Sequence, residues 1–311
     1  MGRTRKEWRA LARKRIASVL RTQVVSNERT LEQKISDAGP TNQRVEPHIL
    51  TEALRELQTT REIVTTTIGR TPWYNLSSAA ASEIESRLGL LVPIYEATQT
   101  GEMRTRLGQT LEMATYKSLV RYETRQQFLG HFSDLETHGD EEPYTKVDPP
   151  QVVGRRTLKK GRLDFVVFGD GGPAGIEVKN YRQWLYPERL EVRELLRKCC
   201  EIDTVPVLIA RRFPYLTFQL LHYAGALVHQ TYNQLYFEAD RPVGELAQDK
   251  DLLGYHDIRF GTEPDARLLR FIGHNVSKTL PEARERFDAL KHVHVKPARE
   301  RKPLFKFTQT Y

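Results

Sequence analysis

The chain has 311 residues, of which 39% are apolar and 28% charged, so it can bury one or two sizeable cores and is too aromatic for a disordered chain. Its only two cysteines, Cys199 and Cys200, are adjacent, which excludes a disulfide framework and a four-ligand zinc site built from cysteine. No apolar run approaches the ~20 residues that cross a bilayer, and the N-terminus lacks a signal-peptide core. We therefore expect a cytoplasmic protein with no membrane partner.

The net charge of +8 is concentrated at one end of the sequence. Residues 1–21 hold eight lysines and arginines against one acid, a net charge of +7, and the other 290 residues carry +1. Such an end favours a polyanionic partner such as nucleic acid, and a solvated amphipathic helix is the alternative. We predict a basic arm over residues 1–15. Its expected nucleic-acid-binding residues are Arg3, Arg5, Lys6, Arg13, Lys14 and Arg15.

Residues 16–78 are predicted to form three helices followed by a hairpin. The helices are expected at 16–25, 28–37 and 47–58, and the strands at 63–68 and 73–76 around a turn at 69–72. This order resembles a winged helix-turn-helix domain, which often binds DNA through its third helix and wing. Here the third helix carries Glu52 and Glu56, a poor face for phosphates, so a protein-contact role stays open.

Residues 79–101 are expected to form a linker helix that ends near Pro93, and a long helix is predicted from Gly101 to about Phe128. After an acidic, turn-rich stretch over 134–142, the pattern alternates between strands and helices. Strands are predicted at 150–158, 162–168, 174–179, 204–210 and 234–238, with helices at 187–202 and 214–231. This alternation predicts an α/β fold. Residues 241–311 are expected to be a C-terminal extension with a charged helix at 281–291.

The most informative pattern is an acid in one apolar strand and an acid and a lysine in the next. Asp164 interrupts the strand at 162–168, and Glu177 and Lys179 share one face of the following strand because successive side chains alternate. A glycine-rich hairpin between the strands allows Asp164 to lie beside Glu177. Two neighbouring carboxylates repel each other unless a cation such as Mg²⁺ relieves the repulsion. Such a metal activates water and holds a phosphodiester.

This pattern resembles the PD-(D/E)XK nuclease superfamily, which includes restriction endonucleases and Holliday-junction resolvases. The resemblance implies a restriction endonuclease-like αβββαβ core over residues 102–240. It also implies that Asp164 and Glu177 bind Mg²⁺, with Mn²⁺ as an alternative, and that Lys179 assists the attacking water. Leu163 stands where the family's name-giving proline would be, a departure that is frequent in the superfamily.

Further site residues are expected around this core. The family often has a glutamate on the preceding helix, which Glu112 would supply, with Glu123 as the competing candidate and a solvated helix charge as the ordinary alternative. The Val178 carbonyl is a further expected metal ligand. Gln183 is expected to contact the ligands of the metal and not the metal itself. Four more basic residues are predicted to hold phosphates beside the site, or else to balance the acidic 134–142 stretch: Arg155, Arg156, Lys159 and Lys160.

The sequence thus favours a metal-dependent endonuclease that hydrolyses DNA, in a restriction or phage-defence role. RNA as substrate stays open, and so does a homodimer, because many such nucleases dimerise to cut both strands. The alternative is a non-catalytic nucleic-acid-binding or assembly protein that uses a nuclease-like scaffold.

Overall fold

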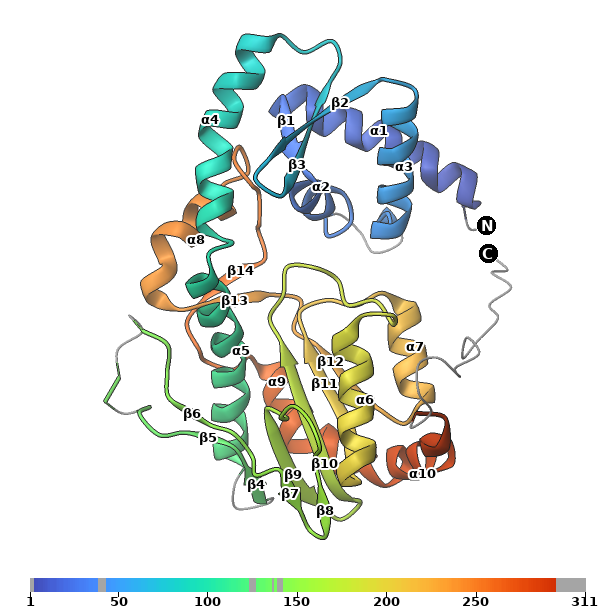
Figure 1. Cartoon of the computed structure of the whole chain (residues 1–311), viewed down its shortest axis with the longest axis vertical. Coiled ribbons are helices and arrows are strands. Elements are labelled where there is room, and N and C mark those ends of the chain that lie inside the picture. Colours follow the sequence, from blue (N-terminus) through green and yellow to red (C-terminus); the bar gives the residue numbers. More distant parts are fainter. Residues whose placement is uncertain (1–2, 39–42, 123–126, 136, 139–141, 295–311) are drawn as a thin grey trace. The chain divides into compact units, whose positions relative to one another are not determined.

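The computed structural model describes residues 3–38, 43–122, 127–135, 137–138 and 142–294 (Figure 1). Its fold is mixed α/β, as predicted. The described residues divide into two compact units, one formed by residues up to 103 with 241–258 and the other by 104–240 with the residues from 259 onward. The expectation of a single C-terminal extension over 241–311 is therefore wrong, because its first 18 residues belong to one unit and the following residues to the other.

The first unit combines helices with a small antiparallel sheet of order β1-β3-β2. Its elements are α1 (Arg5–Gln23), β1 (Val25–Asn27), α2 (Glu28–Ile35), α3 (Pro47–Thr59), β2 (Ile63–Ile68), β3 (Thr71–Leu76), α4 (Ala81–Ala97) and α8 (Arg241–Gln248). The predicted second and third helices and the hairpin are present, whereas β1 was not expected. Pro47 lies in the first turn of α3, where its missing N–H costs no helical hydrogen bond.

Helix α1 joins two segments that were expected separately, the basic arm, predicted to be helical from Lys6, and the helix at 16–25. Its N-terminus is fixed by a capping box, in which the Glu7 amide donates to the Thr4 hydroxyl and the Thr4 amide donates to the Glu7 carboxylate. No glycine or proline follows before Gln23, so the helix continues without a break. The apolar face of α1 then packs against α3 through Ile16 and Leu50, both fully buried.

The second unit is built on a five-stranded mixed sheet of order β12-β11-β10-β9-β4. Strands β4, β9 and β10 are antiparallel neighbours, and β10, β11 and β12 are parallel. The strands are β4 (Gln127–Leu129), β9 (Phe165–Gly169), β10 (Gly172–Lys179), β11 (Val205–Ala210) and β12 (Leu227–Gln230). Parallel neighbours require crossovers, which α6 (Leu190–Ile202) and α7 (Tyr215–Tyr223) supply.

Helices cover both faces of this sheet (Figure 1). Ile176 and Val178 of β10 point to the face covered by α5 (Gly101–Arg121) and by the segment α9 (Ala266–Arg270) to η3 (Phe271–Val276). The opposite face packs against α6 and α7. The remaining elements are β5 (His131–Phe132), β6 (Lys146–Val147), β7 (Val152–Val153), β8 (Arg156–Thr157), β13 (Gln234–Tyr236), η2 (Glu238–Asp240), β14 (Ile258–Phe260) and α10 (Ser277–His294).

Three predicted boundaries are wrong for local reasons. Helix α4 runs through Pro93, and the carbonyl that this proline leaves without a donor belongs to the exposed Gly89. Helix α5 ends at Arg121, and Phe128 belongs to β4. The helix expected at 214–231 ends at Tyr223, because Gly225 turns the chain into β12.

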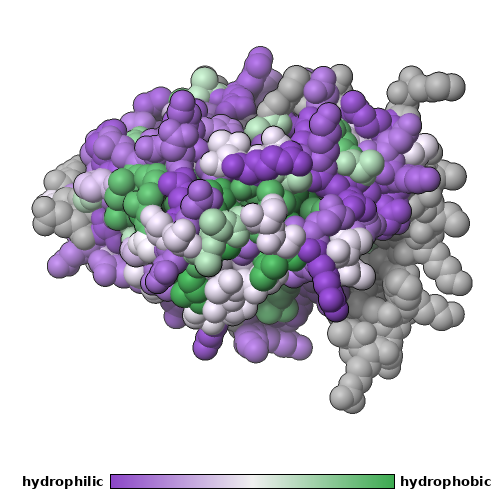
Figure 2. Space-filling model, turned by 90° about the horizontal axis from the view of Figure 1, so that it is seen from above, coloured by the Kyte–Doolittle hydropathy of each residue, from purple (hydrophilic) through white to green (hydrophobic). Residues whose placement is uncertain are grey.

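The surface carries scattered apolar groups. Figure 2 shows hydrophobic residues in green reaching the surface between hydrophilic residues in purple. Such exposure is normal where the residues do not form one large patch. Within the described residues, no helix combines the length and the apolar character that a bilayer crossing requires.

Candidate active site

Strands β9 and β10 bring both predicted acids to Lys179. The paired residues of the two strands end with Phe165 and Ile176, so Asp164 comes directly before the ladder. The Asp164 amide donates to the Ile176 carbonyl at 3.0 Å, and because Ile176 is already opposite Phe165, this contact departs from the regular antiparallel pattern as in a β-bulge. Asp164 therefore lies at the end of the sheet where β10 finishes with Lys179.

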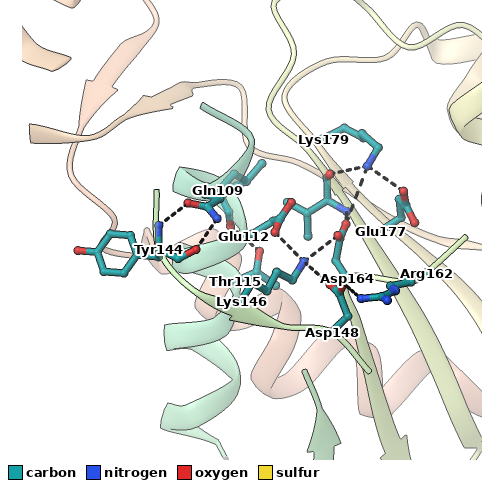
Figure 3. A network of polar contacts seen from close by, with 12 residues as sticks. Gln109, Glu112, Thr115, Tyr144, Lys146, Asp148, Arg162, Asp164, Glu177 and Lys179 are labelled. Atoms are coloured by element: carbon teal, nitrogen blue, oxygen red, sulfur yellow. Dashed lines mark hydrogen bonds and ion pairs between the residues drawn. The ribbon is translucent and has the colours of Figure 1, made fainter. Parts of the chain in front are cut away.

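Lys179 lies at the point where three oxygen atoms converge (Figure 3). Its Nζ lies 2.8 Å from Glu177 Oε1, 3.0 Å from the Val178 carbonyl oxygen and 3.9 Å from Asp164 Oδ2. The Val178 amide also donates to Asp164 Oδ2 at 2.7 Å, which fixes that carboxylate. Asp164, Glu177 and Val178 thus all contact Lys179, and Asp164 also contacts the Val178 amide.

Glu112 joins this group through a lysine that the sequence analysis did not identify. Lys146 Nζ lies 2.6 Å from Glu112 Oε2 and 2.9 Å from Asp164 Oδ1, so it bridges the two carboxylates (Figure 3). The segment that carries Lys146 is held to α5 by Gln109, whose side chain both donates to and accepts from the backbone of Tyr144 at 2.7 Å. The competing candidate, Glu123, lies outside the described residues.

A second unexpected lysine approaches the site from α6. Lys198 Nζ donates to Glu177 Oε2 at 2.9 Å and to the Arg162 carbonyl at 2.6 Å. Lys198 is only 8% exposed, because it lies on the buried face of α6 between Leu195 and Ile202. A lysine inside an apolar helical stripe is a signal that the sequence offered. No comparable signal marks Lys146, whose position depends on how a distant loop docks.

Burial and charge set the protonation of these groups. Burial alone would raise the pKa of Asp164, but the ammonium groups of Lys179 and Lys146 outweigh it and hold that pKa below its usual value. Burial alone would lower the pKa of Lys179 and of Lys146, but the adjoining carboxylates, with Asp164 first, raise both. For Glu112, burial and the Asp164 carboxylate raise the pKa to about 7, although Lys146 acts in the opposite direction.

The donor set at Lys179 fits a hard divalent cation. Two carboxylates and a backbone carbonyl are the oxygen ligands that Mg²⁺ and Mn²⁺ accept, and they already surround one positively charged atom. Within the described ranges, no three acidic, histidine or cysteine side chains gather at one point. Besides the two carboxylates, the oxygen that contacts Lys179 Nζ is the Val178 carbonyl, whereas the side chain of Glu112 contacts Lys146.

Gln183 does not take the supporting position that the sequence suggested. Its Oε1 accepts a hydrogen bond from Arg189 at 3.2 Å, in the loop between β10 and α6. That loop turns away after Lys179, so a residue four positions later is not required to face the carboxylates. Among the contacts of the described residues, none joins Gln183 to Asp164, Glu177 or Lys179.

The first two residues of the basic run before Asp164 lie away from the site, contrary to expectation. Arg155 and Arg156 line a cavity of about 680 Å³ with Gly172, at the start of β10. Lys179 ends the same strand seven residues later, roughly 23 Å away at the rise of a β-strand. Lys159 and Lys160 are attached through their backbones to Glu201 and Arg197 of α6, with exposed side chains. Arg155 and Arg156 are therefore not placed to hold phosphate beside Lys179, and the role predicted for Lys159 and Lys160 stays a prediction.

The N-terminal basic residues differ in what they contact. Arg5 pairs with Glu52, and Arg13 pairs with Glu62 at 2.6 Å. Arg3 stacks over the Trp8 ring with 4.9 Å to the centroid, and Arg15 donates to the Gln43 carbonyl. The exposed lysines of α1 are Lys6 and Lys14. The charge of α1 is thus partly neutralised by the acidic residues that follow it in the first unit.

Comparison of the chain with protein-family models, with curated proteins and with solved structures yields no match. What can be said of its function therefore depends on the site geometry above.

Proposed function

We propose that this protein is a metal-dependent nuclease that hydrolyses phosphodiester bonds in DNA. The observation that carries the proposal is the convergence of Asp164, Glu177 and the Val178 carbonyl on the Lys179 ammonium. Two carboxylates and a carbonyl, each with an oxygen within 4 Å of one lysine ammonium, are groups that metal-assisted attack of water on a phosphodiester uses.

The arrangement of the elements supports the same proposal. After α5 the strands of the large sheet and the crossover helix follow in the order β4, β9, β10, α6 and β11, with the short strands β5 to β8 between β4 and β9. This order is similar to the αβββαβ order expected from the resemblance to the PD-(D/E)XK superfamily, and it supports the proposal. The first unit, with the order α1, β1, α2, α3, β2, β3, is similar to winged-helix domains.

The protein groups at the site have distinct roles in this proposal. Asp164, Glu177 and the Val178 carbonyl would hold Mg²⁺ or Mn²⁺, which when bound supplies a Lewis acid and makes water more acidic. Lys179 donates hydrogen bonds as observed, so it would orient a water or a phosphate oxygen. Lys146 and the Val178 amide fix the Asp164 carboxylate before any substrate arrives.

One observation favours a second candidate, a non-catalytic scaffold that binds nucleic acid. Each of the three carboxylates already has an ammonium partner, because Lys146 contacts Glu112 and Asp164, and Lys198 contacts Glu177. Charges compensated in this way need no metal for stability. The two candidates differ in one measurable respect, which is turnover of a phosphodiester.

Cleavage of supercoiled plasmid by the full chain with Mg²⁺ or Mn²⁺ tests the proposal. We expect nicking that stops with a chelator and falls by about 100-fold or more in Asp164→Asn and in Lys179→Met, because the first removes a negative charge that would hold the metal and the second removes the ammonium group at the reacting centre. Lys117→Met is the matched control, since Lys117 pairs with Glu263 elsewhere in the second unit. A wild-type protein that binds DNA but cleaves neither DNA nor RNA would contradict the nuclease proposal and support the scaffold function.

A further inference from the structure

Strand β2 is an edge strand of the sheet in the first unit, and its sequence has no features that would prevent pairing with another strand. Among the described residues, β3 is its only strand neighbour. The strand contains six residues with neither a charge nor a proline, its three threonines are exposed, and Val64 is 47% exposed. Edge strands of monomeric proteins usually carry charges, prolines or bulges that prevent pairing with another chain. β2 has none of these protections along its length.

The hairpin determines which backbone groups of β2 point outward. The two-residue turn at Gly69 and Arg70 joins the paired residues Ile68 and Thr71, and at the other end of the ladder the Ser77 amide donates to the Glu62 carbonyl at 3.0 Å. Hydrogen-bonded pairs alternate along an antiparallel ladder, so the even-numbered residues bond to β3. The N–H and C=O groups of residues 63, 65 and 67 therefore face away from the sheet.

The partner of Thr67 agrees with this assignment. Thr67 is opposite Pro72, which has no N–H to donate, and a proline is compatible with the ladder only at a pair that exchanges no hydrogen bonds. A further antiparallel strand on this edge must then bond to the odd-numbered residues. In a pair of identical β2 strands, odd-numbered residues must lie opposite odd-numbered residues.

One such register is self-complementary. With Thr66 on the two-fold axis, Thr65 of one copy bonds to Thr67 of the other. Glu62, which also pairs with Arg13 of its own chain, then lies level with Arg70 in the turn of the other copy, and Val64 lies opposite Ile68, each twice by symmetry. Opposite charges and matched apolar or threonine pairs stabilise adjacent strands. A shift of two residues in either direction would place Glu62 opposite Ile68 or Val64 opposite Arg70, and both shifts lose the charge pair.

We propose that two copies of this chain form a homodimer by antiparallel pairing of their β2 strands in this register, which joins two three-stranded sheets into one of six strands. The interface is isologous, as a two-fold dimer requires, because each copy offers the same strand. It explains why an apolar side chain such as Val64 stays exposed in one copy. The proposal does not depend on nuclease activity, so either can fail without the other.

Charge variants test the register directly. In sedimentation velocity at micromolar concentration, the wild-type chain of 36.0 kDa is expected at twice its own mass. Arg70→Glu alone and Glu62→Arg alone place like charges opposite each other, so we expect at least a tenfold rise of the dimer dissociation constant in each. An equimolar mixture of the two variants restores both opposite-charge pairs and should restore the dimer. Arg70→Lys keeps the charge and is the control.

A backbone variant tests the hydrogen bonds. The N–H of Thr67 faces outward, so Thr67→Pro removes a bond to the second copy and none to β3, whereas Thr67→Val keeps the N–H and the β-branched shape. We expect Thr67→Pro to be monomeric with an unchanged circular dichroism spectrum, and Thr67→Val to be dimeric. A monomeric wild type, or a mixture of the charge variants that stays monomeric, overturns the proposal even if Thr67→Pro fails to fold.

Discussion

At the residue scale, carboxylates and ammonium groups alternate along the end of the large sheet. Each group lies within 4 Å of the next. The order is Glu112, Lys146, Asp164, Lys179, Glu177 and Lys198. Because these side chains are mostly buried, the removal of one charge leaves a neighbour without its partner in a poorly solvated place. Their contributions to stability are therefore coupled and will not add.

The protonation of Glu112 gives a testable pH dependence. Its pKa in the folded protein is about 7, above the ordinary value of 4.5, so between these pH values the folded state holds more protons than the unfolded state. The free energy of unfolding therefore falls as the pH rises from 4.5 to 7. Glu112→Gln removes this titration. We expect the free energy of unfolding of the variant, relative to that of the wild type, to rise by on the order of 3 kcal/mol from pH 4.5 to pH 8.

Urea denaturation of both proteins at the two pH values measures that difference. Glu263→Gln, on an exposed residue of the same unit, is the control for general effects of pH. An equal difference between Glu112→Gln and wild type at pH 4.5 and pH 8 would show that Glu112 ionises normally in the folded protein.

The sequence predicted part of this chain of charges and not the rest. Strand alternation is a local property, so it places Glu177 and Lys179 on one face and allows Asp164 to lie opposite. Lys146 is separated from Asp164 by a loop, and its position depends on how Gln109 holds Tyr144. No local pattern encodes that docking. The same limit explains Gln183, whose loop could turn toward or away from the site with equal local propensity.

At the scale of single elements, the turn from α7 to β12 depends on Gly225. This residue has φ +77°, and the Ala226 amide donates to the Leu221 carbonyl, which is the hydrogen bond of a glycine C-cap. A Cβ at position 225 would lie 2.3 Å from the Phe287 amide nitrogen and 2.6 Å from the Ala283 carbonyl oxygen of α10. The glycine thus serves both the turn and the close approach of α10.

A pair of alanine variants separates these two roles. Gly154→Ala, at φ +60° with nothing within 4 Å of the new Cβ, should lose only the cost of a left-handed backbone, about 1–2 kcal/mol of unfolding free energy. Gly225→Ala has the same backbone cost and must also displace α10, so we expect about 1–3 kcal/mol more. Urea midpoints compare the two variants. Equal losses of unfolding free energy in the two variants would mean that α10 can move away from position 225 without an energetic cost.

Element prediction succeeded where periodicity is strong and failed where a single residue ends or extends an element. Helix α3 and strand β11 lie where their apolar patterns indicate. The predicted helix end at Pro93 is wrong, because α4 is so exposed that the carbonyl without a donor can be solvated. Gly225 marks the boundary between α7 and β12. The sequence does not reveal its second role, because the close approach of α10 to this residue is a tertiary contact.

At the scale of the whole molecule, the distribution of basic charge gives a prediction about nucleic acid. Lys6 and Lys14 are exposed on α1, whereas Arg5 and Arg13 are paired with glutamates. If DNA is the partner, each lysine that contacts a phosphate contributes about 0.9 to the slope of log affinity against log salt concentration. We expect Lys6→Ala with Lys14→Ala to reduce that slope by about 1.8.

Fluorescence anisotropy with labelled duplex DNA over a series of salt concentrations measures the slope. The matched control is Arg5→Ala with Arg13→Ala, which should change the slope less because those guanidinium groups already have partners. If both double variants show the wild-type slope, α1 does not contact the phosphate backbone, and the basic N-terminal helix serves the fold alone.

The return of residues 241–258 to the first unit has a consequence for synthesis on the ribosome. Gln23 of α1 donates to the carbonyls of Lys250 and Leu252, and Gln33 of α2 contacts His256. About 155 residues must be translated after position 103 before these contacts can form. At 5–20 residues per second, the first 103 residues wait roughly 8–30 s with that surface uncovered. The interrupted unit is therefore the part of the chain that should most depend on a chaperone during translation.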